Sequence, residues 1–484
     1  MSKDVKPTPP SQSGGGSPAG CTAESCCATD FKISPCNIVK VDGTLQIAAT
    51  EMDGFPAGSY EWTTSSGKIT LQNHTSATVT VRAGASPGGG RESETITVTR
   101  RSTGCDPVTK TVKVTVAKVT FSESPNQRYG YDDFDTPADN TDDHICVKKS
   151  DHTFVKVKIE GGALGTDFDW VCDTPATCTP VQPGGDAEFD LRLDAGAENK
   201  RETTLHAKVK CPSAQSFASL KVHVYKERSV DVVIAKFDKT DAGTNLRFPT
   251  ADYASHQASA NDKLKQGVVK YNLSNHDAAN KPTAVNLASG TASVTYDIAA
   301  NGGADLTALS AAMTGTGTKV RVAIIRDMKS VYYLKTAAAA GATTLEVTAG
   351  STFLQTGRTY PLGNGATRET ISVTGLSGGT ITCAALTHAH AVGETIEFPA
   401  AGWSSDPILI IEGSASLDVA KWTILHEVGH KAQGLGLRDI IDTTNFMHFS
   451  QAWTDYRLRY CPRLKNYPAG TTDKENQWET IPRT

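Results

Sequence analysis

Apolar and polar residues alternate along most of the first half of the chain, in short runs separated by turn residues. Runs such as LQIAAT, SATVTVRA and ETITVTR are followed further on by FVKVKIE, AEFDLRL and TTLHAKVKC. Side chains two apart lie on the same side of a strand, so this alternation predicts strands with one buried and one solvent-facing side. Short runs of this kind with turns between them are typical of β-sandwiches.

The alternating region repeats once between residues 36 and 228. Each unit has a cysteine, a tryptophan 26 or 24 residues later, and a second cysteine 43 or 41 residues after that. The six residues are Cys36, Trp62, Cys105, Cys146, Trp170 and Cys211. The repeat predicts two immunoglobulin-like β-sandwiches, over 36–120 and 146–228, with each tryptophan on a strand that crosses the core.

The segments around these units are polar. Residues 1–35 are rich in proline, glycine and serine and predict a flexible tether, which is either a tail without a role or an attachment segment. Residues 121–145 predict an acidic linker, with carboxylates at Asp132, Asp133, Asp135, Asp139, Asp142 and Asp143. Such carboxylates can bind Ca²⁺, but the glycine and terminal glutamate of an EF-hand are missing. We therefore favour a solvated linker.

The pattern changes in the region 229–484. After the run SVDVVIAKF, VRVAIIRDM predicts a buried strand and PILIIEG a further strand, and NDKLKQGVVKYNLS favours a helix. Between them, residues 332–398 consist of short alternating runs and glycine turns, which predict a small β insertion. His388 and His390 lie in it two residues apart, so a metal site on one strand face is the alternative to the surface turn that we favour.

Charge and composition exclude some partners. The net charge is −4 and the lysines and arginines are spread along the chain, so we expect no nucleic-acid partner. No run of about 18 apolar residues exists, so we expect no membrane insertion. The first residues lack the apolar region of a signal peptide, and we expect synthesis in the cytoplasm followed by export through another route.

Eleven cysteines suggest an oxidising destination. Because their number is odd, at least one thiol stays free or pairs between chains. The pairings that we expect are Cys36–Cys105, Cys146–Cys211 and Cys172–Cys178.

The strongest helix signal is SASLDVAKWTILHEVGHKAQG, residues 414–434. Side chains four apart share one face of a helix, so His426 and His430 can both bind one tetrahedral zinc ion. Glu427 lies about 100° around the helix from His426. In that position it can take a proton from water activated by zinc and pass it to the leaving amine. The motif predicts a zinc peptidase with Glu427 as the general base.

The third zinc ligand stays open at this level. In the spacing of metzincin-type sites, Gln433 replaces the glycine and Gly436 replaces the last ligand. The alternatives are Asp439, Glu475 with Glu479 behind it, and His448.

Residues from about 229 to 484 resemble the neutral zinc metallopeptidase domains attached to bacterial type VI secretion spike proteins of the VgrG kind. The resemblance rests on the LHEVGH helix, the turn NFMHFS followed by RLRYCPR, the closing ENQWETIPR, and the β segment inserted after VYYLK. It implies an α+β zincin-like fold, with His426, His430 and Glu475 as zinc ligands and Asp439 as the alternative to Glu475. It also implies Glu427 as the catalytic base.

The resemblance further implies an antibacterial effector that an injection apparatus delivers to the periplasm of a target cell. This chain lacks the spike domain, so it looks like a cargo that docks on a spike or carrier protein, and an immunity protein is an expected partner. Two other functions stay open: a structural or adhesive component of a secretion tail, and a metallopeptidase directed at peptidoglycan rather than at protein.

Overall fold

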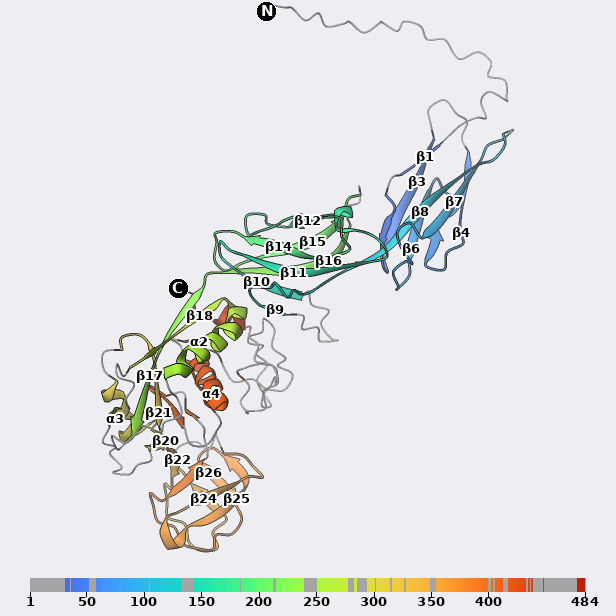
Figure 1. The fold of residues 1–484 in the computed structure, drawn as a ribbon. Coiled ribbons are helices and arrows are strands. Elements are labelled where there is room, and N and C mark those ends of the chain that lie inside the picture. The colour runs from blue at the N-terminus through green and yellow to red at the C-terminus, as the bar shows by residue number, and fades with distance from the viewer. Residues whose placement is uncertain are drawn as a thin grey trace, which may run out of the picture.

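The chain forms a row of two β modules, a domain with helices, and a β-rich unit at the far end (Figure 1). The computed structural model describes residues 31–34, 36–51, 58–103, 105–132, 143–182, 184–211, 215–238, 250–276, 283–284, 294–300, 302–313, 316–325, 328–348, 354–398, 402–403, 405–411, 417–431, 434–435, 437, 447 and 477–483. Within these residues no helix is both long enough and apolar enough to cross a membrane.

The first module is a sandwich of two sheets. Its strands are β1 (Phe31–Ile33), β2 (Ile38–Lys40), β3 (Thr44–Glu51), β4 (Ser59–Thr64), β5 (Ile69–Gln72), β6 (Thr78–Ala83), β7 (Glu94–Arg101) and β8 (Val108–Glu123). One sheet has the order β1-β3-β6-β5; in the other, β4, β7 and β8 are neighbours and β2 runs parallel to β8. This order is that of an immunoglobulin-like sandwich. Trp62 on β4 is buried between the sheets, and its indole nitrogen donates to the Ser76 carbonyl oxygen at 2.7 Å.

The second module has the same topology. Its elements are β9 (Tyr131–Asp132), β10 (Asp143–Lys148), β11 (His152–Glu160), η1 (Gly165–Asp167), β12 (Phe168–Cys172), β13 (Cys178–Pro180), β14 (Glu188–Ala195), β15 (Arg201–Val209) and β16 (Ser216–Tyr225). The sheet β12-β15-β16-β10-β9 faces the sheet β13-β14-β11, whose outer partner is β8. Trp170 on β12 is buried, and its ring meets those of Phe121 and Phe189 edge-on. Both modules are immunoglobulin-like, as the repeat predicts.

Strand β8 belongs to both modules. Its first part pairs with β7, and residues 118–123 pair with β11. The prediction of a linker over 121–145 is therefore wrong at both ends, because β8, β9 and the start of β10 lie in it. Asp132 on β9 is buried, and Asp143 on β10 accepts a hydrogen bond from the Tyr131 hydroxyl at 2.6 Å. The other four aspartates of that segment lie outside the described residues. The predicted tether over 1–35 overlaps the first module, since β1 starts at Phe31; residues 1–30 lie outside the described residues.

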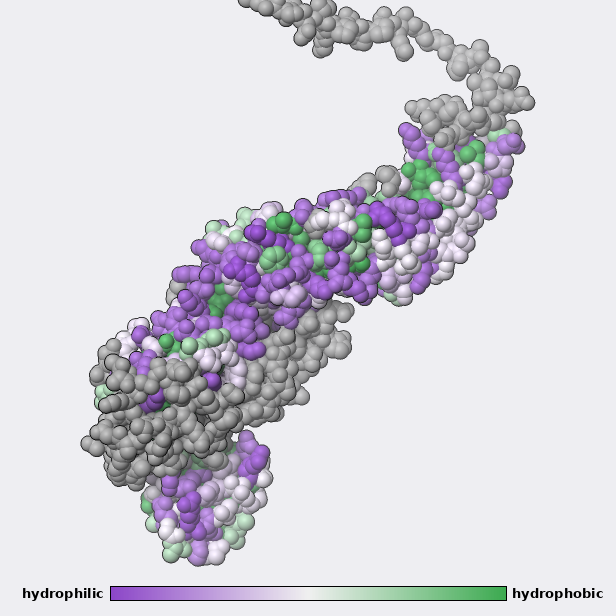
Figure 2. Space-filling model, viewed as in Figure 1, coloured by the Kyte–Doolittle hydropathy of each residue, from purple (hydrophilic) through white to green (hydrophobic). Residues whose placement is uncertain are grey.

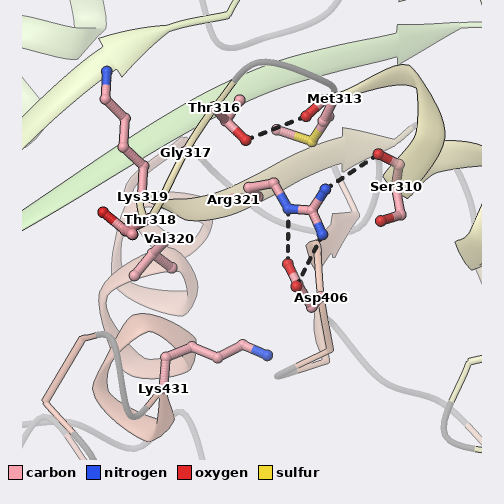
Figure 3. A pocket seen from close by; sticks show the side chains of 10 residues that line it. All are labelled: Ser310, Met313, Thr316, Gly317, Thr318, Lys319, Val320, Arg321, Asp406 and Lys431. Carbon is pink, nitrogen blue, oxygen red and sulfur yellow. Dashed lines mark hydrogen bonds and ion pairs between the residues drawn. The ribbon is translucent and has the colours of Figure 1, made fainter.

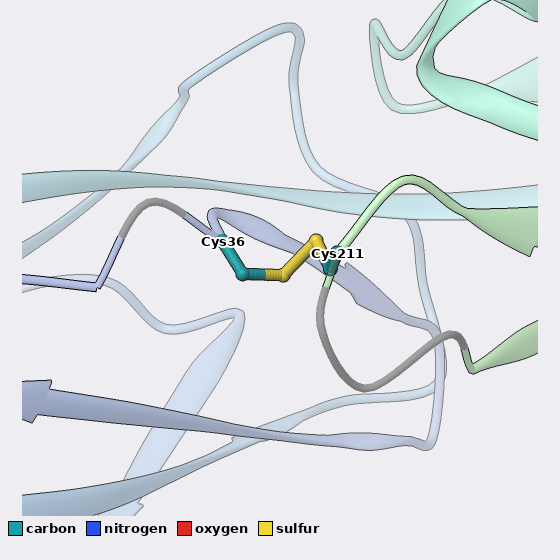
Figure 4. Close-up of a disulfide and its surroundings, with 2 residues drawn as sticks. All are labelled: Cys36 and Cys211. Atoms are coloured by element: carbon teal, nitrogen blue, oxygen red, sulfur yellow. A yellow bond between two sulfur atoms is a disulfide. The ribbon is translucent and has the colours of Figure 1, made fainter.

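A disulfide between Cys36 and Cys211 crosses from one module to the other (Figure 4). The expected pairings are wrong: Cys36 and Cys211 pair with one another, Cys105 is disulfide-bonded but not to Cys36, and Cys146, Cys172 and Cys178 are buried free thiols. Pairing within each unit fails because Cys36 precedes β2 at the end of the first module that faces the second. The shared strand and the bridge together hold the two modules as one arm.

Replacing both Cys36 and Cys211 by serine should lower the free energy of unfolding of this arm by about 2–4 kcal/mol. The bridge joins residues 175 apart, so the unfolded chain gains much freedom when it is removed. Urea unfolding followed by circular dichroism measures the change. Cys383→Ser, a change at a free thiol of the β insertion, serves as the control. An unchanged urea midpoint in the double variant would show that β8 alone joins the modules.

The C-terminal domain is built on a mixed sheet with the order β18-β17-β21-β29-β28, and β19 also pairs with β17. Strands β17, β18, β21 and β29 are parallel, and β28 is antiparallel to β29. The bounds are β17 (Arg228–Asp238), α2 (Thr250–Leu264), η2 (Lys265–Gly267), β18 (Val269–Asn275), β19 (Thr283–Ala284), α3 (Ala304–Ala312), β21 (Val320–Ile325), β28 (Gly402–Trp403), β29 (Ile408–Ile411), α4 (Leu417–His430) and α5 (Gln477–Thr480).

Alternate residues of these strands enter two cores. Val232, Val322 and Ile408 pack with α2 and α4 on one side of the sheet, and Ala235 and Leu409 pack with α3 on the other. The first core also includes Cys146 and Tyr225 of the second module, and Trp478 of α5. The arm therefore packs directly against the domain that carries the HEVGH helix.

The β insertion forms its own unit beyond this sheet (Figure 1). Its elements are β20 (Val294–Asp297), β22 (Met328–Tyr333), β23 (Thr344–Glu346), β24 (Thr359–Leu362), η3 (Gly365–Thr367), β25 (Glu369–Ser377), β26 (Thr380–Cys383) and β27 (Thr395–Phe398). They make one sheet with the order β20-β22-β27-β24-β25-β26-β23. The unit thus begins before residue 332, because β20 and β22 pair with its strands.

Polar side chains cover most of the visible surface of the described residues (Figure 2). Among these residues the exposed large apolar side chains are Val181 and Val392, which lie in different modules. Two isolated residues do not make an apolar docking patch.

Candidate metal centre

Helix α4 carries the HEVGH motif and packs against β28 and β29. Its side chains Ile424, Leu425 and Val428 are buried in the core that α4 shares with α2. The remaining sides of the helix carry His426, His430 and Glu427, which are partly exposed. Because the apolar side chains of α4 all face the core, the three polar side chains of the motif lie on the sides of the helix that are not buried in it.

The two histidines lie side by side on α4. Their Nε2 atoms are 3.2 Å apart, and the rings are perpendicular with centroids 4.8 Å apart. Two nitrogens at 2.0–2.1 Å from one tetrahedral zinc ion are separated by about 3.3 Å. The distance between the two Nε2 atoms therefore fits a shared zinc ion.

His430 is held by the chain that follows the helix. Its Nδ1 donates to the Leu437 carbonyl oxygen at 3.0 Å, which leaves Nε2 as the nitrogen with a lone pair for a metal. In the turn that follows the helix, the Leu437 amide also donates a hydrogen bond to the Gly429 carbonyl oxygen at 2.8 Å. Gly434 allows this turn, because a Cβ there would lie 2.2 Å from the Val428 carbonyl oxygen. The hydrogen bond from His430 Nδ1 to a backbone carbonyl oxygen is of the type that orients metal-binding histidines.

Glu427 lies near two other polar side chains. Burial, and after it the carboxylates of Glu427 and Asp297, raise the pKa of Tyr296 to about 12. Burial lowers the pKa of Lys431, and the carboxylates of Asp406 and Glu427 oppose that shift only in part. No motif in the sequence marks Tyr296 or Lys431 as a residue near the site. Lys431 could have been found, since it follows Glu427 by one helical turn.

The candidates for the third zinc ligand are Asp439, Glu475 with Glu479, and His448. Asp439, Glu475 and His448 all lie outside the described residues, and so does the side chain of Glu479. Within the described part of the chain, no third His, Cys, Asp or Glu joins a pair to form a metal-binding group. Met447, from the turn after the motif, is fully buried in the core shared with α4. Of the predicted zinc ligands, the described residues therefore bring together His426 and His430.

The pair His388 and His390 does not form a metal site in this structure. The surface-turn prediction is wrong for His390, whose side chain is fully buried. Its Nε2 is 2.8 Å from Glu369 Oε1 and its Nδ1 is 2.6 Å from Glu394 Oε2. A carboxylate at each ring nitrogen favours the protonated form of His390, which ties β25 to the turn before β27. Glu369 could not be foreseen, because it lies 21 residues away in sequence.

This ion network gives the insertion a pH-dependent stability. The bonds to Glu369 and Glu394 hold the pKa of His390 above its usual value despite burial. The network therefore stabilises the fold fully between about pH 4.5 and pH 6.5. Its contribution is lost as the pH rises through the raised pKa of His390, and also as the pH falls through the lowered pKa values of Glu369 and Glu394. His390→Gln should cost about 3–5 kcal/mol at pH 6, because it leaves two carboxylates without their cation.

Thermal unfolding of both proteins between pH 6 and 9 measures the effect. The difference in melting temperature between wild type and His390→Gln should shrink as the pH rises. Exposed His74→Gln in the first module is the control and should behave as wild type. A constant difference across this range would mean that His390 is neutral in the folded protein.

Comparisons with known proteins add little to this geometry. No family model and no curated protein matches the chain. A nucleoside hydrolase-related protein from Saccharophagus degradans is similar over 16% of this chain and 21% of its own, at 20% identity and a TM-score of 0.14. A C-terminal intimin fragment is similar over 41% of this chain and 63% of its own, at 13% identity and a TM-score of 0.22. The fibronectin(III)-like modules of CbhA from Clostridium thermocellum are similar over 41% of this chain and 95% of theirs, at 14% identity and a TM-score of 0.21.

These TM-scores carry no argument about function, and the chain spans less than two thirds of the first two of these proteins. The immunoglobulin-like assignment rests instead on the strand order of the two modules.

Proposed function

We propose that the chain is a zinc-dependent peptidase with its centre on α4. The observation that carries the proposal is the 3.2 Å separation of the His426 and His430 Nε2 atoms, with His430 oriented by Leu437. A zinc ion held there would supply a Lewis acid that lowers the pKa of water and polarises the carbonyl of the substrate. Glu427 is then the general base, which takes a proton from the attacking water and passes it to the leaving amine.

An extended peptide is the substrate that the surrounding fold favours. In the described part of the sheet, β28 is an end strand that pairs with β29 alone, and α4 packs against both. An end strand offers unpaired backbone groups, to which a peptide can add as a further strand. This arrangement supports a zincin-like domain that cleaves protein or peptide chains.

We assign Glu475 as the third zinc ligand, with Asp439 as the alternative. Trp478, three residues after Glu475, is fully buried in the core that contains Leu425 and Val428 of α4. The chain is therefore anchored in the core of α4 at a position three residues after Glu475 in the sequence. Glu475→Ala should weaken zinc binding about 10-fold or more, and Asp439→Ala should not. The reverse result would move the ligand to Asp439.

Delivery as an injected antibacterial effector is part of the proposal, and the resemblance of residues 229–484 to type VI secretion peptidase domains is its support. The disulfide between Cys36 and Cys211 agrees with work in an oxidising periplasm. The tether and the arm of two sandwiches are then the parts that dock on a spike or carrier protein. An immunity protein in the producing cell is the remaining partner.

The substrate class can be tested directly. Zinc-loaded protein is incubated in parallel with a denatured periplasmic protein extract and with purified peptidoglycan, and the products are separated by mass. We expect new peptides from the extract and an unchanged peptidoglycan. Release of cross-link peptides from peptidoglycan would favour the peptidoglycan-directed enzyme, and a zinc-free folded protein without activity would favour the structural or adhesive component.

A further inference from the structure

A cavity of about 520 Å³ lies at the C-terminal end of α4, with Lys431 in its lining (Figure 3). On one wall, Nε and Nη2 of Arg321 each lie 2.9 Å from a carboxylate oxygen of Asp406. The Arg321 Nη1 also donates to the Ser310 carbonyl oxygen at 3.1 Å. Because these groups satisfy one another, we assign the cavity no ligand.

Two thiols lie together inside the second module. Cys172 ends β12 and Cys178 begins β13, and these strands belong to opposite sheets of the sandwich. Both side chains enter the same core, where Cys172 is 5% exposed and Cys178 is 0% exposed. Neither is part of a disulfide in this structure. The pair is therefore sulfur chemistry that the rest of the site does not use.

A short loop with a fixed conformation brings the two cysteines together. Residues 173–177 connect β12 to β13, and the amides of Thr177 and Cys178 both donate to the Thr174 carbonyl oxygen, at 2.9 and 3.3 Å. The Gly196 amide holds the loop from outside through the Thr177 carbonyl oxygen at 2.8 Å. A Cβ at Gly196 would lie 1.9 Å from the Ala176 carbonyl oxygen, so the approach is close. These bonds keep the two ends of the loop side by side.

The two sulfur atoms contact each other. The hydrogen bond between the Cys172 and Cys178 thiols, and after it burial, raise the pKa of Cys178 above its usual value. A disulfide needs the two sulfurs at bonding distance and the two side chains directed toward each other. Because these sulfurs already meet, a small rotation of the side chains is enough to join them.

We propose that Cys172 and Cys178 are a redox modification site, which closes to a disulfide between the two sheets of the second module in an oxidising compartment. The free thiols in the structure are the reduced state of this pair. The oxidant is a reactive disulfide, such as oxidised glutathione or the active-site disulfide of an oxidoreductase. The inference concerns the arm alone and does not depend on zinc.

The reaction consists of two thiol–disulfide exchanges. The thiolate of Cys172, the more exposed of the pair, attacks one sulfur of the oxidant, which gives a mixed disulfide at Cys172 and releases the other sulfur as a thiolate. Cys178 then loses its proton and attacks the Cys172 sulfur, which releases the second thiolate. The two cysteines lose two electrons and two protons in total, and the oxidant is reduced to two thiols.

The position of the bond gives it a stabilising role. The second exchange takes place within the molecule, and the contact between the sulfurs compensates for the raised pKa of Cys178. The new bond closes the loop from Cys172 to Cys178 and thereby reduces the freedom of the unfolded chain. The arm is then more stable in the kind of compartment in which the bridge between Cys36 and Cys211 also persists.

Mass spectrometry of one peptide tests the site. Trypsin releases residues 159–192, which contain Cys172 and Cys178 and no other cysteine. Full-length protein is reduced with dithiothreitol, transferred to buffers with increasing ratios of oxidised to reduced glutathione, quenched with acid, and alkylated with N-ethylmaleimide in urea before digestion. We expect two alkyl groups on this peptide before the transfer and none after it. Two alkyl groups at every glutathione ratio would overturn the site.

Single variants test the order of the two exchanges. Cys178→Ser should accumulate glutathione at Cys172, because the second exchange is blocked, and Cys172→Ser should carry no glutathione at Cys178. Glutathione on Cys178 alone would overturn the assignment of Cys172 as the first nucleophile.

Calorimetry tests the stabilising role. The melting temperature of the second module should rise on oxidation by about 5–10 °C more in wild type than in Cys172→Ser. Cys383→Ser, at a buried free thiol of the β insertion, is the matched control and should gain as much as wild type. An equal gain in wild type and Cys172→Ser would overturn the stabilising role of the bond.

Discussion

Glu427→Gln should lower kcat/KM for peptide hydrolysis by about 10²–10⁴-fold, the range of a lost general base. Glutamine has nearly the same shape but cannot take a proton from water. The histidines are untouched, so the zinc content and the fold should stay as in wild type. Hydrolysis of a fluorogenic peptide mixture by zinc-loaded protein measures the rate, and circular dichroism checks the fold.

Glu188→Gln is the matched control, because it makes the same chemical change on an exposed strand of the second module. It should retain the full rate. If Glu427→Gln also retained the full rate while binding zinc, the role of Glu427 as the base would be wrong. If it lost zinc, the carboxylate would be acting on the metal site itself.

Trp478→Ala should lower the free energy of unfolding of the C-terminal domain by about 3–5 kcal/mol. The indole is fully buried, packs edge-on against His223, and belongs to a core that joins the second module to α4. Arg483 fixes the same segment: its Nη2 donates to the carbonyl oxygens of Gly267 and Trp478, and its guanidinium lies 4.1 Å from the ring centre of Tyr225. Replacing the indole by a methyl group therefore leaves a cavity, because the neighbouring residues are held in place and cannot move in to fill it.

Urea unfolding followed by far-ultraviolet circular dichroism measures this loss. Trp478→Phe retains part of the ring and should lose less than Trp478→Ala. Zinc affinity should fall together with stability, because the closing segment carries the proposed ligand Glu475. A Trp478→Ala protein with the stability and zinc affinity of wild type would show that this segment contributes to neither.

The sandwiches could be predicted because strand alternation is a local signal. Leu45 and Ile47, two apart, are both buried, as the period of a strand requires. The sharing of β8 and the bridge from Cys36 to Cys211 could not be predicted in this way. Both depend on how one module meets the next, and the spacing of cysteines within each repeat favours the wrong partners.

In the candidate site, too, one part follows from local sequence and the other depends on contacts between distant segments. Helical spacing alone places His426 beside His430, and the structure gives the pair a separation that suits zinc. The contact from Leu437 and the cavity at Lys431 depend on the turn after α4 and on strands far away in sequence. His390 shows the opposite error: a polar motif that favoured a surface turn is buried, because two carboxylates compensate its charge.

The zinc content of the purified chain tests the central claim most directly. Mass spectrometry for metals should find about one zinc per chain in wild type, and His426→Ala and His430→Ala should each retain less than about a tenth of it with the fold intact. A folded wild-type protein without zinc after incubation with the ion, or variants that hold as much zinc as wild type, would contradict a metal centre on α4.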